Sequence, residues 1–163
     1  LNTYLTCINA SDRDLEYFIN ELRNIGRPVV LVFFGDHQPS IAAALNDELY
    51  PQEDTASHAF RIHQSTYFVW ANYEIAGNTE LNVYDTVGAN EIAAIALNKI
   101  GAPLTDYQKA LLATRSDVPT INVAGYLGAD GLRYDLESED SPYTSTIDKL
   151  RRVQYLEFAT KVQ

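Results

Sequence analysis

The most constraining feature of the sequence is an apolar run over residues 29–34 that ends at Gly35 and is followed at once by Asp36 and His37. The run is rich in β-branched and aromatic residues, does not alternate with polar ones, and is far shorter than the ~20 residues of a membrane-spanning helix. These properties predict a strand buried on both faces, as in a parallel sheet covered by helices. Because ligands of open α/β sheets collect beyond the carboxyl ends of the strands, we expect Asp36 and His37 at a functional edge.

The adjacent acid and imidazole suggest a metal site. A carboxylate oxygen and a neutral imidazole nitrogen both bind divalent ions such as zinc or manganese. Two ligands do not complete a site, and the remaining histidines, His58 and His63, are five residues apart, which is a poor helical spacing for a pair of ligands. The residues favour exposed loop histidines there over two further ligands for Asp36 and His37.

Composition bounds the class of protein. A chain of 163 residues, 46% of them hydrophobic, predicts one domain over residues 1–163. The net charge of -10 argues against a nucleic-acid surface, which needs a basic patch. A single cysteine, Cys7, excludes an intrachain disulfide and a thiolate cluster, and we expect it to be a buried residue of the first helix. Since the chain has no methionine, we expect it to be a piece of a longer protein.

Periodicity predicts the order of the elements. Apolar residues at three- and four-residue steps predict a first helix over about residues 5–25, with Asp12 and Asp14 on its solvated face. Asp-Gly between two apolar runs predicts a hairpin around residues 127–131. Arg151 and Arg152 are expected on a solvated helix edge and not at a phosphate. The other expected elements are helices over residues 41–49, 89–99, 106–114 and 143–159, a strand over 66–71, and loops over 52–59 and 77–81.

This order is α/β, with too few core strands for a complete doubly wound sheet. We therefore expect an incomplete domain whose missing strands precede the chain. The expected architecture is a three-layer sandwich with helices on a mostly parallel sheet, followed by a carboxy-terminal β-hairpin and helix.

Four blocks of the sequence resemble the sulfatase-type phosphoglycerol transferases, the lipoteichoic acid synthase family of the alkaline phosphatase superfamily. The most specific block is Val-Phe-Phe-Gly-Asp-His-Gln-Pro at residues 32–39. Residues 4–19, 66–73 and 152–158 are weaker matches in the same order as in that family. The resemblance covers nearly the whole chain and corresponds to the carboxy-terminal part of the catalytic domain.

The resemblance implies a bacterial enzyme on the outer face of the plasma membrane, anchored by amino-terminal membrane helices. Such enzymes use a threonine and a divalent ion, usually Mn²⁺, to transfer glycerol phosphate from phosphatidylglycerol to a polymer or glycan. Zn²⁺, Mg²⁺ and Ca²⁺ are alternatives. In that family the adjacent acid and histidine are metal ligands, which here are Asp36 and His37.

The same resemblance assigns the nucleophile, the remaining acidic ligand and the substrate-binding histidine to the amino-terminal half of the catalytic domain, which becomes the expected partner of this chain. We therefore expect the chain to be inactive alone. The alternatives are a sulfatase or phosphodiesterase of the same superfamily, or a non-catalytic binding domain that keeps the fold. An unrelated metallophosphoesterase is disfavoured because its flanking Asp-x-His and Gly-Asn-His motifs are absent.

Overall fold

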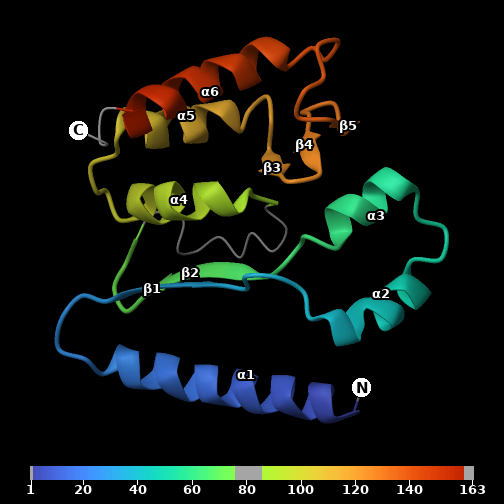
Figure 1. Cartoon of the computed structure of the whole chain (residues 1–163). Helices are drawn as coiled ribbons and strands as arrows, with labels where there is room; N and C mark the ends of the chain where they lie inside the picture. The colour runs from blue at the N-terminus through green and yellow to red at the C-terminus, as the bar shows by residue number, and fades with distance from the viewer. Residues whose placement is uncertain (1, 76–85, 160–163) are drawn as a thin grey trace. The chain divides into compact units, whose positions relative to one another are not determined.

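The computed structural model describes residues 2–75 and 86–159, in two compact units that divide after Asn78. The loop expected over residues 77–81 lies outside the described residues. The described elements combine helices with small antiparallel sheets, which confirms the α/β class (Figure 1). None of the described helices has the length and apolar character needed to span a membrane.

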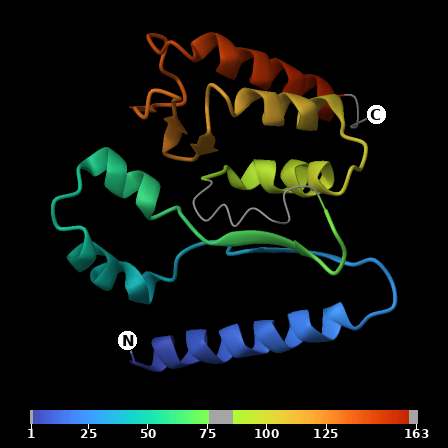
Figure 2. The ribbon, with the colours of Figure 1, turned by 180° about the vertical axis from the view of Figure 1, so that it is seen from behind.

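The first unit contains a long helix and a two-stranded sheet. Its elements are α1 (Asn2–Arg23), β1 (Val30–Phe34), a 3-10 turn (Ser40–Ala42), α2 (Ala43–Leu49), α3 (Thr55–Arg61) and β2 (Tyr67–Ala71). Helix α1 runs alongside the β1–β2 pair, as the view from behind also shows (Figure 2). Side chains of both elements, including Leu15, Ile19 and Phe68, line a shallow groove of about 300 Å³.

Asn72 fastens the end of α1 to this sheet. Its side-chain amide donates to the carbonyl oxygens of Leu22, at 3.1 Å, and of Arg27, at 3.0 Å, and its side-chain oxygen accepts from the Val29 amide at 2.9 Å. The bond to Leu22 pairs a carbonyl that the end of a helix leaves without an intrahelical donor, and the other two bonds hold the segment between α1 and β1. They therefore fix how the chain turns from α1 into β1.

The expected burial and pairing of the 29–34 strand are wrong. Strand β1 pairs with β2 in antiparallel register, from Val30 opposite Ala71 to Phe34 opposite Tyr67. Its residues are only partly buried, and Phe33 and Phe34 are 37% and 56% exposed.

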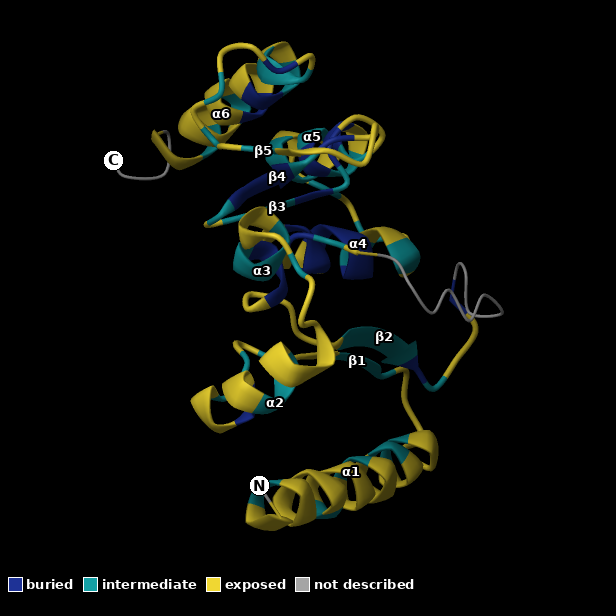
Figure 3. Ribbon diagram, turned by 90° about the vertical axis from the view of Figure 1, so that its right-hand side faces the viewer, coloured by how far each residue is buried: buried dark blue, intermediate teal, exposed yellow. Residues whose placement is uncertain are grey.

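The reason is the connection between the strands. Between β1 and β2 the chain forms α2 and α3, which are tied to each other by side-chain contacts, and it re-enters the sheet at the end it left. A parallel pairing would have required the connection to cross the sheet to its other end. Within the described part of this unit, one helix runs along the two strands, and most strand residues are of intermediate burial (Figure 3).

Two local predictions in this unit also fail. Residues 55–61 form α3 and not an irregular loop, because the Asp54 side chain caps the helix by accepting from the Ser57 amide at 2.9 Å. Cys7 is exposed, and no residue of α1 is buried, so the expectation of a buried cysteine is wrong. Asp12 and Asp14 are exposed on α1, as expected.

The described part of the second unit, residues 86–159, contains three α-helices and three short strands. Its elements are a 3-10 turn (Ala89–Glu91), α4 (Ile92–Lys99), α5 (Asp106–Thr114), β3 (Thr120–Asn122), β4 (Gly125–Leu127), β5 (Arg133–Tyr134) and α6 (Thr144–Ala159). The strands form one antiparallel sheet in the order β3-β4-β5. The expected hairpin is the β4–β5 connection, and a second hairpin joins β3 to β4.

The hydrophobic core of this unit includes a cluster of three buried residues, Val118, Tyr126 and Ile147. Tyr134 stacks on Tyr126 with ring centroids 5.5 Å apart and meets the edge of Tyr143 at 5.8 Å. The helix predicted over residues 106–114 begins where Thr105 caps it, with the Thr105 hydroxyl accepting from the Gln108 amide at 3.2 Å.

Candidate metal site

Asp36 and His37 lie where β1 leaves the sheet. The Gly35 amide donates to the Thr66 carbonyl at 3.0 Å, which is the last strand pairing on this side. A Cβ on residue 35 would collide with the Ser65 hydroxyl, so the two strands approach each other closely at this glycine. The next two side chains project into solvent, with exposed fractions of 83% for Asp36 and 75% for His37.

The two side chains face each other. The Asp36 Oδ2 and His37 Nε2 atoms are 3.5 Å apart, while Asp36 Oδ1 accepts from the His37 backbone amide at 2.9 Å. His37 Nδ1 lies 3.0 Å from the Gln38 carbonyl oxygen. Because a carbonyl oxygen can only accept, Nδ1 carries the proton in this bond. In the neutral form of the ring, Nε2 is then the nitrogen with a lone pair, and Nε2 is the one that faces Asp36.

This geometry fits a divalent cation. Two ligand atoms at about 2.1 Å from a tetrahedral ion are about 3.4 Å apart, close to the separation of Oδ2 and Nε2. A backbone carbonyl that accepts from the far ring nitrogen is also the usual support of a metal-binding histidine. As a bare surface ion pair the same contact would contribute little to stability, because both groups are largely solvated. Asp36 and His37 could therefore supply two ligands to a divalent ion.

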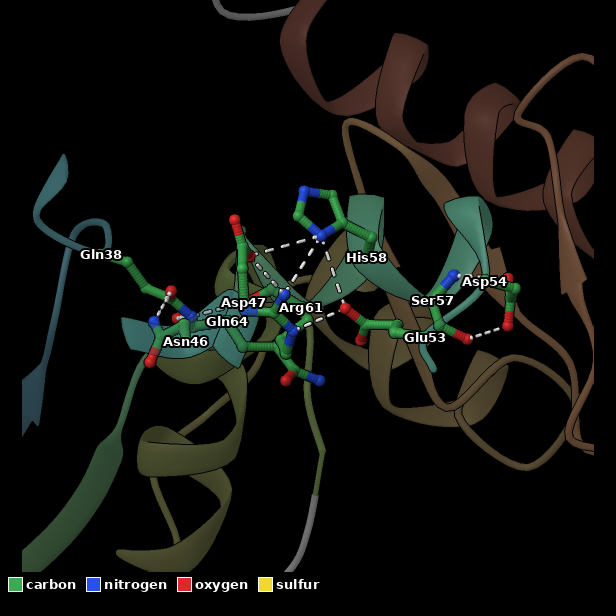
Figure 4. A network of polar contacts seen from close by, with 9 residues as sticks. All are labelled: Gln38, Asn46, Asp47, Glu53, Asp54, Ser57, His58, Arg61 and Gln64. Atoms are coloured by element: carbon green, nitrogen blue, oxygen red, sulfur yellow. Dashed lines mark hydrogen bonds and ion pairs between the residues drawn. The ribbon is translucent and has the colours of Figure 1, made fainter. Parts of the chain in front are cut away.

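A charged network lies beside this turn, between α2 and α3 (Figure 4). The Arg61 side chain is only 10% exposed; its Nε donates to Glu53 Oε2 at 2.7 Å and its Nη2 to Asp47 Oδ1 at 3.0 Å. Hydrogen bonds to Glu53 and then Asp47 raise the pKa of Arg61 above its usual value, which keeps it charged. The guanidinium also lies over the Tyr50 ring, 4.9 Å from its centroid.

The other histidines do not join Asp36 and His37 in a common site. His58 belongs to the charged network, where its Nδ1 lies 3.1 Å from Arg61 Nη2 and 3.5 Å from Glu53 Oε2. His63 is exposed just after α3. Within residues 2–75 and 86–159, no group of three or more histidine, cysteine, aspartate or glutamate side chains is arranged to hold a metal ion.

Two other features have local roles. The Arg151 Nη2 donates to the Leu136 carbonyl at 2.7 Å and to Glu137 Oε1 at 2.8 Å, so this arginine fastens α6 to the segment after β5. Arg152 is exposed on the same helix. Neither Asp36 nor His37 lines the groove along α1, whose residues are Asp12, Leu15, Glu16, Ile19, Asn20, Arg23 and Phe68.

The sequence reasoning missed Gln38 and Arg61. Gln38 follows His37 directly, yet its side-chain partners Arg61 and Gln64 are 23 and 26 residues further along the chain. No local sequence pattern predicts contacts between residues this far apart in the chain. The only signal was a polar residue next to the candidate ligands.

A protein-family model matches the part of the chain that contains Asp36 and His37. The sulfatase family model matches residues 1–96, which is more than half of the chain and includes β1, Asp36 and His37. The chain therefore belongs to the sulfatase family of the alkaline phosphatase-like superfamily, whose members are hydrolases and transferases that generally use divalent metals. No curated protein and no solved structure matches the chain significantly.

Proposed function

We propose that this chain supplies two ligands, Asp36 and His37, to the divalent-metal site of an enzyme that transfers phosphoglycerol from a membrane phospholipid to a cell-envelope polymer or glycan. The observation that carries the proposal is the 3.5 Å approach of Asp36 Oδ2 to His37 Nε2 at the end of β1, within the part of the chain that matches the sulfatase family. The resemblance of residues 32–39 to the phosphoglycerol transferases supports the finer assignment.

Each residue has a distinct role in this proposal. Asp36 binds the ion as an anionic ligand, and His37 binds it as a neutral one through Nε2, with its Nδ1 proton held by the Gln38 carbonyl. When bound, the ion neutralises charge on the phosphoryl group and lowers the pKa of the attacking hydroxyl. Two protein ligands leave coordination positions open for substrate and for groups outside these residues.

The nucleophile is proposed to lie outside this chain. Thr6 and Thr66 fall in blocks that match other parts of the family pattern, Thr3 directly precedes one of these blocks, and none of the three is assigned that role. The enzyme is proposed to act at the outer face of a bacterial plasma membrane, where its phospholipid donor and glycan acceptor are found, and to use Mn²⁺, with Zn²⁺, Mg²⁺ and Ca²⁺ as alternatives.

The test measures Mn²⁺-dependent release of diacylglycerol from phosphatidylglycerol vesicles by the complete gene product. His37→Ala is expected to reduce the rate to below about 1% of wild type, because a metal's contribution of several kcal/mol to the barrier corresponds to at least such a factor. His63→Ala is the matched control, since His63 is an exposed histidine of the same unit, and it is expected to retain the wild-type rate.

Parallel assays with other substrates distinguish the related activities. Turnover of an aryl sulfate without diacylglycerol release would identify a sulfatase, and turnover of bis(p-nitrophenyl) phosphate alone would identify a phosphodiesterase. Absence of both Mn²⁺ binding and turnover would leave a non-catalytic binding domain. A fully active His37→Ala variant would refute the metal-ligand assignment.

A further inference from the structure

Gln38 connects the exposed ligand pair to the charged network between α2 and α3. Its backbone carbonyl accepts from His37 Nδ1. Its side chain reaches toward α2 and the end of α3 (Figure 4). The residue is half-buried, whereas its two predecessors are exposed. Gln38 is therefore the first residue after the ligand pair whose side chain the rest of the unit holds in place.

The side-chain amide of Gln38 is engaged on both of its polar atoms. Its nitrogen donates to the carbonyl oxygens of Arg61, at 2.7 Å, and Gln64, at 2.9 Å, and its oxygen accepts from the Asn46 side-chain amide at 2.9 Å. Two carbonyl oxygens require a donor, so the amide can point only one way. These contacts leave the side chain little freedom to rotate, and the backbone of Gln38 is held with it.

The acceptors of this amide are themselves anchored. One is the carbonyl of Arg61, whose guanidinium bonds to Glu53 in the α2–α3 connection and to Asp47 in α2. Asn46, which donates to the amide oxygen, also lies in α2. The helical pair formed by α2 and α3 thus holds Gln38 from two elements.

Holding Gln38 in place also fixes the hydrogen-bond acceptor of the His37 ring. The tautomer of a histidine is set by the bond that one of its nitrogens makes, and here the partner is the carbonyl of the residue that the helical pair holds. In the neutral ring, a fixed acceptor for Nδ1 keeps the proton on that nitrogen, so the nitrogen with the lone pair is Nε2, which faces Asp36. A mobile acceptor would not make that selection.

We propose that Gln38 is a positioning residue of the metal site: its side chain, held by Asn46, Arg61 and Gln64, fixes the carbonyl that selects the Nδ1-protonated form of His37. The inference rests on the proposed function for its metal, but the selection of the tautomer is a property of the metal-free chain. Gln38 touches neither the ion nor the substrate in this assignment.

The test compares Gln38→Met with Gln52→Met. Methionine keeps the length of the side chain and removes all three hydrogen bonds, and Gln52 is an exposed turn residue that offers the same substitution without these contacts. The readouts on the 163-residue chain are the tautomer of His37, from ¹⁵N shifts of its two ring nitrogens without metal, and the affinity for Mn²⁺, from the spin resonance of the free ion.

Wild type and Gln52→Met are expected to show the Nδ1-protonated form of His37. Gln38→Met is expected to shift the ring toward the Nε2-protonated form, which histidine favours in water, and to weaken Mn²⁺ binding about 10- to 100-fold, as loss of an outer support of a metal ligand typically does. Asn46→Ala removes only the donor to the amide oxygen, so a smaller shift in the same direction is expected; it also provides a reading if Gln38→Met does not fold.

An unchanged tautomer in folded Gln38→Met, with or without a lower melting temperature, would overturn the proposal, because a purely structural role moves stability alone. The two proposals fail separately. If wild type binds no Mn²⁺ but the tautomer shifts in Gln38→Met, the metal assignment falls while the positioning of His37 by Gln38 stands.

Discussion

Asp36 of the first unit and Asp130 of the second unit have similar sequence surroundings, since each lies in a glycine-containing turn next to an apolar strand. Their oxygen atoms are used differently. Asp130 Oδ1 accepts from the Leu132 amide at 3.0 Å, and its Oδ2 accepts from the Tyr134 hydroxyl at 2.7 Å. Asp36 Oδ1 accepts from the next backbone amide, and its Oδ2 faces the ring nitrogen of His37.

The difference shows what makes a carboxylate available for chemistry. The hydroxyl of Tyr134 and the amide of Leu132 stabilise the charged form of Asp130, which lowers the pKa of this carboxyl below its usual value. Both oxygens of Asp130 are therefore engaged in hydrogen bonds within its own turn. By contrast, Oδ2 of Asp36 is open to solvent and faces His37 Nε2, the second possible metal ligand. Of these two turns, only the one after β1 can therefore bind a cation while keeping its local structure.

Removing each of the two carboxylates in turn is the strongest test of this contrast. Asp36→Ala is expected to weaken Mn²⁺ binding by about 100-fold or more, since even outer supports of metal ligands account for 10- to 100-fold. Asp130→Ala is expected to leave Mn²⁺ binding unchanged and to lower the melting temperature by several degrees, because the Tyr134 hydroxyl and the Leu132 amide lose their acceptor. Spin resonance and circular dichroism on the same samples measure both. Equal effects of the two substitutions on Mn²⁺ binding would contradict the comparison.

The second-largest effect is expected at the glycines of the two turns, Gly35 and Gly128, where alanine should lower stability by different amounts. At Gly128 a Cβ would meet the ring of Tyr143, which packs against Tyr134, whereas at Gly35 it would meet the end of the Ser65 side chain, which can rotate. Gly128→Ala is therefore expected to cost about 1–3 kcal/mol of unfolding free energy, as overpacking does, and Gly35→Ala less than about 1 kcal/mol. Urea denaturation checks the order, and a larger cost at Gly35 would show that the approach of the strands there is rigid.

The smallest effect concerns pH. The hydrogen bond to Asp130, helped by burial, raises the pKa of Tyr134 to about 12. A raised folded-state pKa adds stability that is complete below the ordinary pKa near 10 and is lost as pH rises toward 12. The lowered pKa of Asp130 adds stability above its ordinary value of 3.8 that is lost as pH falls below it.

Tyrosinate absorbance should therefore contain a late step near pH 12 that Tyr134→Phe removes. Tyr155→Phe, at an exposed tyrosine of α6, should leave that step in place. Asp130→Asn should move the step to lower pH, because an amide does not stabilise the protonated hydroxyl as a carboxylate does. A late step that survives in Tyr134→Phe would show that another tyrosine carries it.

Local patterns predicted the elements well where their stabilising contacts are local. Thr105 and Gln108 are three residues apart and form a capping box, so the start of α5 could be predicted from the sequence. Asp54 and Ser57 indicate the start of α3 by the same principle, whereas the polar composition of residues 52–59 favours a loop, and this composition was the misleading signal. The start of each of these two helices is set by contacts within one helical turn, so each is in principle predictable from the local sequence.

Contacts across long stretches of chain were not predictable in this way. The antiparallel pairing of β1 with β2 depends on the return path through α2 and α3, and apolar composition alone does not specify it. The pairing of Asp36 with His37 followed from adjacency, whereas the hold of Asn46, Arg61 and Gln64 on Gln38 required the folded unit.

The sequence by itself determined the kinds of element, their order and the presence of an acid beside an imidazole after an apolar run, because these follow from spacing over a few residues. Only the tertiary structure decided which neighbour β1 takes, how much of it is covered, and which atom of His37 is turned toward Asp36. Those outcomes depend on hydrogen bonds between residues more than twenty positions apart, whose geometry exists only once α2 and α3 have brought the chain back to the strand.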